Sequence, residues 1–415
     1  SSSCRVRLRQ LPTQGGRGTM TTTGVAAGSP PVAANPLLGG HQSYGAMVEL
    51  VPGSGHAAPV PLPSGPDVLR VTTFNLLAPV WTHQSIYPGM DMAEFEPSRR
   101  RVQQLRALKL LDPDVVCMQE CQKSELEQLL PLEDGFLQGR YDVEFCPFPP
   151  TFWTNWLTDA TNYEPRENGV CVLTKRSAMK KLGAEHVPID LPGWRDMLPE
   201  SSLGAHACFV KVTVNAWQQA KAMIVTSHLD ADSAFRAGLQ GKALCRTLTA
   251  EYLKDYDCII WGGDFNMEWR SPALGAIESE GFARASQEVR TPTVYSCGGC
   301  VRVDHIFYAR APSSSVTLEC LGTYVPTCPM GHLFQVIPLL TELQWLVCSA
   351  KGDYGQCQRV ATVLLTLLLF PLVVLVLFIP VIILATCGRG AQLRRVGWAL
   401  QTCGSDHLPV TVSIR

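Results

Sequence analysis

The strongest constraint on this chain is a series of polar residues placed where short hydrophobic strands end. The segments are TFN, MQE, SHL, GGDFN and SDHLP, and a sixth, VDHIFY, places an acid at the start of a strand. In chain order the polar residues are Asn75, Glu120, His228, Asp264, Asn266, Asp304, Asp406 and His407. Each alone has a structural explanation, such as a turn, a helix cap or a core histidine. Together they would leave several buried charges unpaired, which is too unfavourable unless a cation or a substrate group compensates them.

The hydrophobic pattern from Val68 onward predicts a mixed α/β domain, because short apolar strands alternate with helical stretches. The expected strands are residues 69–75, 115–120, 169–174, 208–214, 223–228 and 258–262. The expected helices are residues 97–111 and 232–252. The first begins with a proline in its first turn and carries apolar residues at helical spacing.

The composition bounds the classes of protein to consider. The chain has 415 residues, of which 46% are hydrophobic and 17% charged, so a sizeable core is available. Its formal net charge of -1 excludes a globally basic nucleic-acid coat, and a nucleic-acid substrate would have to be held locally. The 16 cysteines are too dilute for a disulfide scaffold, and we expect mostly reduced, buried thiols.

The first 67 residues differ in texture from the rest. They are rich in Ser, Gly, Pro, Thr and Ala and contain no acid before Glu49, which predicts a disordered N-terminal segment over residues 1–67. Its arginines also fit a transit peptide, although no amphipathic stripe supports one. Because the first methionine is Met20, we expect residues 1–19 to be a translated upstream region or the remainder of a longer chain.

A second unusual region is residues 360–386, which contain no charged residue. As a helix this segment would extend about 40 Å, enough for a bilayer core of roughly 30 Å, so it predicts a membrane segment. The larger cluster of arginines follows the segment and favours a cytoplasmic C-terminal flank. The expectation is a membrane-associated protein with a cytoplasmic-facing catalytic domain. The alternative for this segment is a buried core helix.

The order of the motifs, with GDFN followed by SDH, resembles the endonuclease/exonuclease/phosphatase superfamily. The resemblance covers residues 68–311 and the last dozen residues. It implies a four-layer α/β fold, in which two β-sheets pack face to face with helices outside and the site lies at one end of the sandwich. The catalytic domain would then comprise residues 68–330 and 404–415, interrupted by an insert at 331–403.

The resemblance also implies a divalent cation and the residues beside it. Asn75 and Glu120 would take the metal position, with Glu120 as a direct ligand, and Asp406 would support the metal side. Carboxylate and amide oxygens are the ligands that Mg²⁺ or Mn²⁺ accepts, whereas zinc would require more His or Cys. The segment NGVCVLTK resembles one that carries a further polar site residue, which maps to Glu167 or to Asn168 as a substrate-binding residue.

The remaining site residues would act on a phosphodiester. By the resemblance, Asp264 and Asn266 would orient the attacking water and the phosphate, and His228 would bind the phosphate. His407 would lie against the scissile phosphate, with Asp304 fixing its tautomer. Such an Asp–His pair with a divalent cation can position water and relieve charge on the developing oxyanion.

Within the superfamily, TFNLLAP is most similar to the opening motif of the carbon-catabolite-repressor-type deadenylases and nocturnin. The resemblance therefore implies an RNA 3′-exonuclease, with RNA favoured over lipid as the substrate. The inositol polyphosphate phosphatases are less similar, because Arg-Val-Asp-His at residues 302–305 replaces their Trp-Cys-Asp-Arg signature. A membrane-attached sphingomyelinase-like phospholipase C remains a competing interpretation.

The hydrophobic segment conflicts with this mechanism. It lies between Asp304 and His407, and a single membrane crossing would place these two residues on opposite sides of the bilayer. A hairpin with residues 332–348 as its first span, a re-entrant bend near Pro371 and Pro380, or a mistaken gene model would each remove the conflict. We favour the hairpin or the gene-model error, and the latter would leave a soluble cytoplasmic enzyme. If the insert keeps the two residues apart, the chain would be a catalytically dead, membrane-anchored interaction protein.

Overall fold

The computed structural model describes eight segments of the chain. They are residues 62–84, 86–148, 168–189, 206–231, 233–285, 291–296, 299–326 and 393–415. Residues 1–61, which hold most of the predicted disordered segment, lie outside them, as does the predicted membrane segment 360–386. Within the described part of the chain, no helix is both long and apolar enough to cross a bilayer.

The first β-sheet has six strands in the order β13-β14-β1-β2-β4-β3. Their bounds are β1 Leu69–Asn75, β2 Val115–Gln122, β3 Tyr141–Pro147, β4 Asn168–Lys175, β13 Cys320–Tyr324 and β14 Val410–Ile414. The pair β1–β2 is parallel and the other pairs are antiparallel. The last strand of the chain therefore lies in this sheet beside the first.

The second sheet also has six strands, in the order β5-β6-β7-β8-β12-β9. Their bounds are β5 Met179–Pro188, β6 His206–Val214, β7 Ala220–His228, β8 Cys258–Asp264, β9 Ala283–Arg284 and β12 Asp304–Arg310. Only β7–β8 is parallel among these pairs. A short hairpin, β10 Val294–Ser296 with β11 Gly299–Val301, forms a separate two-stranded sheet, and Val294 makes an antiparallel bridge with His407.

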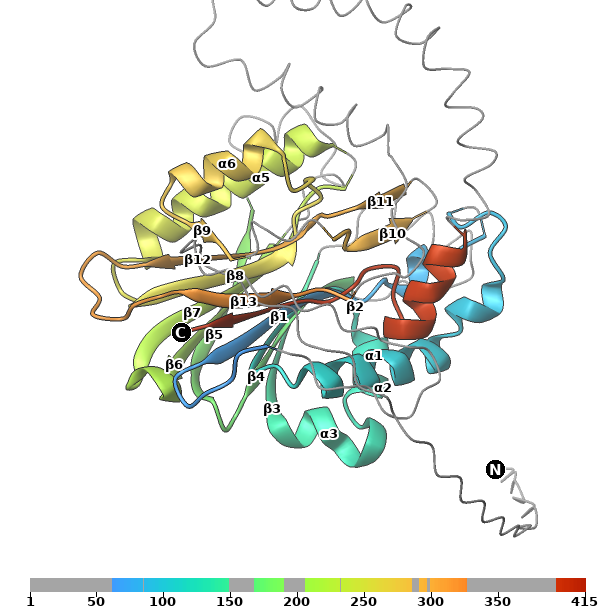
Figure 1. Cartoon of the computed structure of the whole chain (residues 1–415), viewed down its shortest axis with the longest axis horizontal. Helices are drawn as coiled ribbons and strands as arrows, with labels where there is room; N and C mark the ends of the chain where they lie inside the picture. Colours follow the sequence, from blue (N-terminus) through green and yellow to red (C-terminus); the bar gives the residue numbers. More distant parts are fainter. Residues whose placement is uncertain are drawn as a thin grey trace, which may run out of the picture. The chain divides into compact units, whose positions relative to one another are not determined.

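Helices lie outside the two sheets, as Figure 1 shows. Beside the first sheet are α1 Pro97–Leu111, α2 Lys123–Leu129 and α3 Leu132–Arg140; beside the second are α5 Ala234–Thr247 and α6 Pro272–Ser279. Short helical turns are η1 Pro79–Trp81, η2 Met92–Phe95, η4 Asn215–Trp217 and the π-turn η5 Leu248–Tyr252. The predicted fold of two sheets flanked by helices is confirmed.

Alternation along the strands explains how the layers pack. In β7, Ala222 and Ile224 belong to the core cluster that includes the first sheet, whereas Met223 and Val225 belong to the cluster that includes α5 and α6. Successive strand side chains point to opposite faces, so each central strand supplies both layers. The short, continuously apolar strands of the sequence are those buried on both faces.

The predicted elements agree with the structure except at some of their ends. Helix α1 occupies the predicted range, because Pro97 fits its first turn and Asp112 ends it in the left-handed conformation. The second predicted helix is shorter than expected. The Ser233 hydroxyl caps the first turn of α5 by accepting from the amide of Arg236, and the last five residues of the predicted range form the π-turn η5.

Residues 393–403, assigned to the insert by the sequence analysis, form a helix that contributes to the main core. Val396, Ala399, Leu400 and Cys403 are buried in the same cluster as β1 and β14. The predicted insert ends at residue 403, just before the SDH motif, but the apolar spacing that marks this helix begins earlier in the sequence. The described catalytic fold therefore includes this helix, which leads directly to Asp406.

Candidate active site

The predicted site residues converge at one end of the sandwich because of how the strands are paired. In the parallel pairs β1–β2 and β7–β8 the carboxyl ends of both strands lie together. His228 and Asp304 are both in register with Asp264, on the strands to either side of it. Three polar residues far apart in sequence therefore lie side by side across the second sheet.

Asn75 links the two sheets at this end. Its Nδ2 donates to Glu120 Oε1 at 2.9 Å and to Asp264 Oδ2 at 3.0 Å. The second oxygen of Glu120 accepts from the amide of Ala78 at 2.9 Å, and Asn75 Oδ1 accepts from the amide of Leu77 at 2.9 Å. The residues predicted to share the metal position are thus joined in one network.

The direction of the Glu120 side chain depends on an irregular backbone. Glu120 has a φ of 51° within β2, and the register with β4 shifts between Met118 and Cys121. A bulge inserts an extra residue and re-aims a side chain, and a positive φ is unfavourable for a residue with a Cβ. Strain of this kind persists only where the surroundings hold it, and it clusters at functional sites.

His407 and Asp304 form a buried pair. His407 Nδ1 lies 2.9 Å from Asp304 Oδ2, and its Nε2 lies 3.7 Å from Asp264 Oδ2. Burial by itself would lower the pKa of His407, but the carboxylates of Asp304, Asp406 and Asp264 raise it well above its usual value. Nδ1 therefore faces Asp304, which leaves Nε2 directed toward Asp264.

This pair bears on the conflict that the hydrophobic segment raises. The contact between His407 and Asp304 is the one that a single membrane crossing between them would prevent. The catalytically dead interpretation requires the two residues to be kept apart, and here they are joined by a hydrogen bond.

His228, at the end of β7, also belongs to this group of residues, with its Nε2 3.8 Å from Asp264 Oδ2.

Asp406, predicted to support the metal, is held by a residue that the motifs did not indicate. Tyr87 donates its hydroxyl to Asp406 Oδ2 at 2.7 Å, and both side chains are buried. Asp406 Oδ1 is also buried and has no hydrogen-bond partner among the described residues. Burial raises the pKa of Asp406 above its ordinary value. Tyr87 belongs to no strand-end motif, so the pattern that found the other residues could not find it.

The two remaining predicted residues lie at the edge of this group. Asn266 has a φ of 49°, its amide N–H donates to Asp264 Oδ1 at 2.9 Å and its Nδ2 donates to Leu229 O at 2.9 Å, so it braces the turn after β8. Asn168 begins β4 opposite Gln122, and the side-chain oxygens of both are buried and accept no hydrogen bond from any residue that the structure describes. Glu167, the alternative to Asn168, lies outside the described residues.

The donor set fits a divalent cation. Four carboxylates gather at one end of the sandwich, and Asp304 Oδ1, like Asp406 Oδ1, is buried without a hydrogen-bond partner in the described part of the chain. Asp264, Asp304 and His407 each offer a ligand atom within 4.8 Å of the others. Buried carboxylate oxygens that lack donors are unfavourable unless a cation compensates them, and oxygen ligands suit Mg²⁺ or Mn²⁺. The buried group of Asp264, Asp304 and His407 could therefore hold a divalent cation.

The comparison with known families agrees with this geometry. Residues 72–407 match the Endonuclease/Exonuclease/phosphatase family, and the chain belongs to that family. Members of this family are hydrolases of phosphodiester and phosphate bonds that generally depend on a divalent metal. The chain is accordingly a phosphodiesterase or nuclease-type hydrolase, as the motif order predicted.

Solved structures share the fold at low sequence identity. ANGEL2, described as a 2′,3′-cyclic phosphatase, is 14% identical over 84% of this chain and 95% of its own, with a TM-score of 0.51. TDP2 of D. rerio, complexed with a single-strand DNA product, is 12% identical over 84% and 99%, with a TM-score of 0.48. The human nocturnin catalytic domain with a bound sulfate is 18% identical over 62% and 85%, with a TM-score of 0.45. Comparison with curated protein sequences found no match.

Proposed function

We propose that this chain is a Mg²⁺-dependent phosphodiesterase that shortens RNA from its 3′ end, in the manner of a deadenylase. One observation carries the proposal: Asn75 joins Glu120 to Asp264 at the same end of the sandwich where His407 bonds Asp304. In this proposal Glu120 would bind the cation and His407 would bind the phosphate, on opposite sides of Asp264.

The cation would be held by Glu120, with Asn75 and Asp406 supporting it. Once bound, Mg²⁺ supplies polarisation of the phosphate and stabilises negative charge as the bond breaks. The protein fixes the orientation of these ligands. Asn75 orients one oxygen of Glu120, the Ala78 amide orients the other, and Tyr87 fixes Asp406.

The phosphate would lie on the side of the two histidines. His407 contacts Asp304 through Nδ1 and, as an imidazolium, would donate from Nε2 to a phosphate oxygen. His228 lies on the other side of Asp264 and would add a second donor. Donors placed where charge develops accelerate such a reaction, because they need no rearrangement during the step.

Asp264 is the group placed to orient the attacking water. Its Oδ2 accepts from Asn75 and its Oδ1 from the amide of Asn266, so the carboxylate is fixed between the cation side and the histidine side. A water that donates a hydrogen bond to this carboxylate would pass its proton to Asp264 as its oxygen bonds to phosphorus. The bond from phosphorus to the 3′ oxygen of the preceding nucleotide would break, that oxygen would take up a proton from solvent to become a 3′ hydroxyl, and the released mononucleotide would keep the phosphate.

The preference for RNA rests on the resemblance of TFNLLAP to the deadenylase and nocturnin motif. The competing substrate is sphingomyelin, whose hydrolysis would use the same metal chemistry. A direct comparison of the two substrates therefore tests the finer part of the proposal.

The experiment incubates the full chain with Mg²⁺ and either a 5′-labelled oligoadenylate or sphingomyelin in detergent. Glu120→Gln serves as the site-disabled control. A ladder shortened from the 3′ end, absent with the control, supports the proposal. Release of phosphocholine without cleavage of RNA contradicts the RNA assignment, and inactivity toward both substrates contradicts the proposed function.

A further inference from the structure

We propose that Arg100 is a positioning residue, which holds the loop that carries Asn75 and the loop that carries Asp406 in fixed relation from outside the site. This inference rests on the proposed function, because it assigns Arg100 to the same reaction. Arg100 lies on α1 and touches no site carboxylate at ion-pair distance among the described residues. It would therefore act through the backbone of the two loops.

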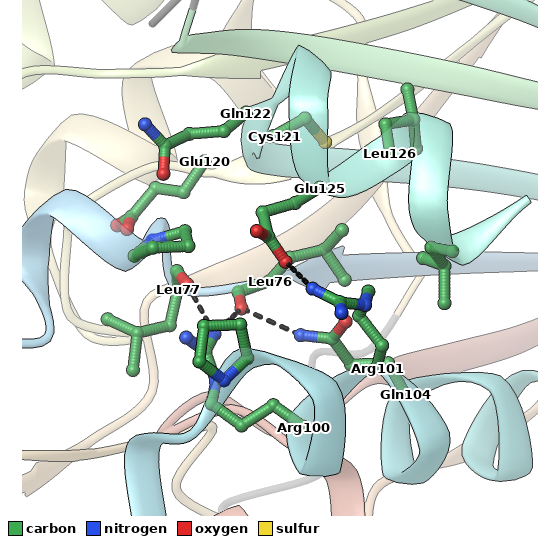
Figure 2. A pocket seen from close by; sticks show the side chains of 13 residues that line it. Leu76, Leu77, Arg100, Arg101, Gln104, Glu120, Cys121, Gln122, Glu125 and Leu126 are labelled. Atoms are coloured by element: carbon green, nitrogen blue, oxygen red, sulfur yellow. Dashed lines mark hydrogen bonds and ion pairs between the residues drawn. The ribbon is translucent and has the colours of Figure 1, made fainter. Parts of the chain in front are cut away.

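The contacts of Arg100 span both loops. Its Nε donates to Gly404 O at 2.8 Å, and its Nη2 donates to Leu76 O at 2.5 Å and also to Leu77 O. Gln104, one turn further along α1, donates to Leu76 O at 3.0 Å and to Gly404 O at 3.2 Å. Figure 2 shows Arg100 and Gln104 directed at the Leu76–Leu77 backbone beside the pocket between α1 and α2.

The positions of these carbonyls connect them to the site. Leu76 and Leu77 directly follow Asn75, and Gly404 precedes Asp406 by two residues. The guanidinium thus joins the metal side of β1 to the loop that ends in the Asp406–His407 pair. Arginine suits this task because its planar fork donates in several fixed directions at once, which an ammonium group does not.

Both loops adopt conformations that need to be held. Leu77 has a φ of 57°, and Gly404 has a φ of 71°. A Cβ added at Gly404 would lie 2.2 Å from the carbonyl oxygen of Arg100, so α1 and this loop are in close contact. Strained backbone persists where the surroundings over-determine it, and the Arg100 contacts are such a restraint.

The burial of Arg100 also matches a role at the site. Arg100 is 3% exposed, and a buried guanidinium is unfavourable unless its donors are used. Its charge faces the acidic groups of Asp406 and Glu120, although its hydrogen bonds go to carbonyls. We infer that the geometry of the fork, beyond its charge, is what the site requires.

The test compares Arg100→Lys with Arg101→Lys. Arg101 is the next residue of α1, lines the same pocket and pairs with Glu125, so its replacement is a matched control for charge-conserving change on this helix. A displacement of about 1 Å at a reacting group lowers the rate by on the order of 10²-fold. For Arg100→Lys we therefore expect kcat on oligoadenylate to fall about 10- to 100-fold with KM changed by less than about 3-fold.

A second readout is independent of catalysis. In Arg100→Lys the backbone amides of Leu77, Ala78, His407 and Leu408 should exchange hydrogen faster than in the wild type, whereas the amides of β6 and β7 should not. In Arg101→Lys both kcat and these exchange rates should stay close to those of the wild type. Should Arg100→Lys fail to fold, Gln104→Met, which removes the parallel contacts, should show smaller changes in the same direction.

The outcomes separate this inference from the proposed function. An active wild type, with Arg100→Lys retaining kcat within 2-fold or with Arg101→Lys losing as much, would overturn the positioning role. An inactive wild type would contradict the proposed function. The exchange rates would still decide whether Arg100 holds the two loops, since unchanged exchange in Arg100→Lys and in Gln104→Met would overturn that as well.

Discussion

Three residues at the site have a backbone conformation that side chains rarely adopt. Leu77, Glu120 and Asn266 all have positive φ values, and none is a glycine. The amide of Leu77 donates to Asn75 Oδ1, Glu120 Oε2 accepts from the amide of Ala78, and the amide of Asn266 donates to Asp264 Oδ1. The strain is therefore concentrated where Asn75, Glu120 and Asp264 must meet, which is the pattern expected of a pre-organised site.

The first prediction concerns Asp264→Asn. We expect kcat for phosphodiester hydrolysis to fall by at least about 10²-fold, because the amide cannot take up the proton of the attacking water. The thermal unfolding midpoint should also fall, because the amide keeps one acceptor oxygen and can satisfy only one of the two donors, Asn75 Nδ2 and the Asn266 amide. Asp257→Asn, just before β8 begins at its opposite end, is the control and should retain activity. Full activity of Asp264→Asn would refute the assigned role.

The second prediction concerns Tyr87→Phe. Loss of a hydrogen bond to a charged group weakens an interaction by about 1.5–3 kcal/mol, and here it would loosen Asp406. We expect the Mg²⁺ concentration for half-maximal activity to rise about 3- to 10-fold, with a smaller change in kcat at saturating Mg²⁺. A titration of activity against Mg²⁺ measures this. An unchanged half-maximal concentration would show that Tyr87 does not support the metal side.

Among single residues, the site residues at strand ends could be predicted from the sequence, whereas supporting residues in loops and helices could not. Asn75 and Asp264 interrupt apolar strands, so their burial is visible in the sequence. Tyr87 lies in a loop without periodicity, and Arg100 lies in a run of three arginines that resembles an exposed helix face. Burial of such residues is decided by tertiary packing, which local pattern does not contain.

At the scale of the element, the ends of helices and strands depend on a few specific contacts. Asp112 ends α1 in the left-handed conformation, and its Oδ1 accepts from Arg140 at 2.8 Å and from Lys175 at 3.0 Å. Burial raises the pKa of Asp112, but Lys175 and Arg140 outweigh it and the net pKa is lowered. The carboxylate therefore stabilises the folded state only while it is ionised.

The third prediction follows from the lowered pKa of Asp112. Asp112→Asn keeps the side chain suited to the left-handed conformation and removes its charge, and because the group is partly exposed we expect a loss of about 0.5 kcal/mol in the free energy of unfolding at neutral pH. The difference from the wild type should persist above the unfolded pKa of about 3.9 and vanish as the pH falls through the lower folded pKa. Urea unfolding across this pH range checks it. If the difference in the free energy of unfolding between the two proteins grew on acidification, the lowered pKa of Asp112 would be contradicted.

The fourth prediction concerns the turn between the helix of residues 393–403 and β14. Gly404→Ala introduces a Cβ at a positive φ and against the backbone of α1, so we expect a loss of roughly 1–3 kcal/mol in the free energy of unfolding. Gly275→Ala in α6 is the matched control, because nothing lies within 4 Å of its Cβ and alanine favours a helix. Urea denaturation of both variants measures the contrast. Equal stability of Gly404→Ala and the wild type would refute the close approach.

The elements themselves were predictable where apolar runs are long, and less so where they are short. Every predicted strand is present, and β2 extends two residues beyond its predicted end because Cys121 and Gln122 pair with β4 after the bulge. Strands such as β5, with alternating charged and apolar residues on a partly exposed face, were not predicted. The pairing of β5 with its buried neighbour β6 decides the conformation of β5 more than its own sequence does.

At the scale of the molecule, the decisive fact is that distant parts of the chain complete one site. Asp304 and Asp406 are separated by 102 positions in the sequence, yet His407 contacts Asp304, and β14 pairs with β1. The family motif order predicted this arrangement, whereas the hydrophobic segment argued against it. Non-local strand pairing cannot be deduced from hydropathy, and the motif order was the better guide because it describes the assembled site.

The most direct test of the central claim is a single comparison on the full chain. Release of mononucleotide from a 3′-terminal oligoadenylate is measured before and after removal of divalent metal with a chelator, and again after Mg²⁺ is restored, for the wild type and for His407→Asn. We predict that the wild type loses activity with the metal and recovers it with Mg²⁺, and that His407→Asn stays at least about 10²-fold slower throughout. Metal-independent release, or an equally active His407→Asn, would contradict the account.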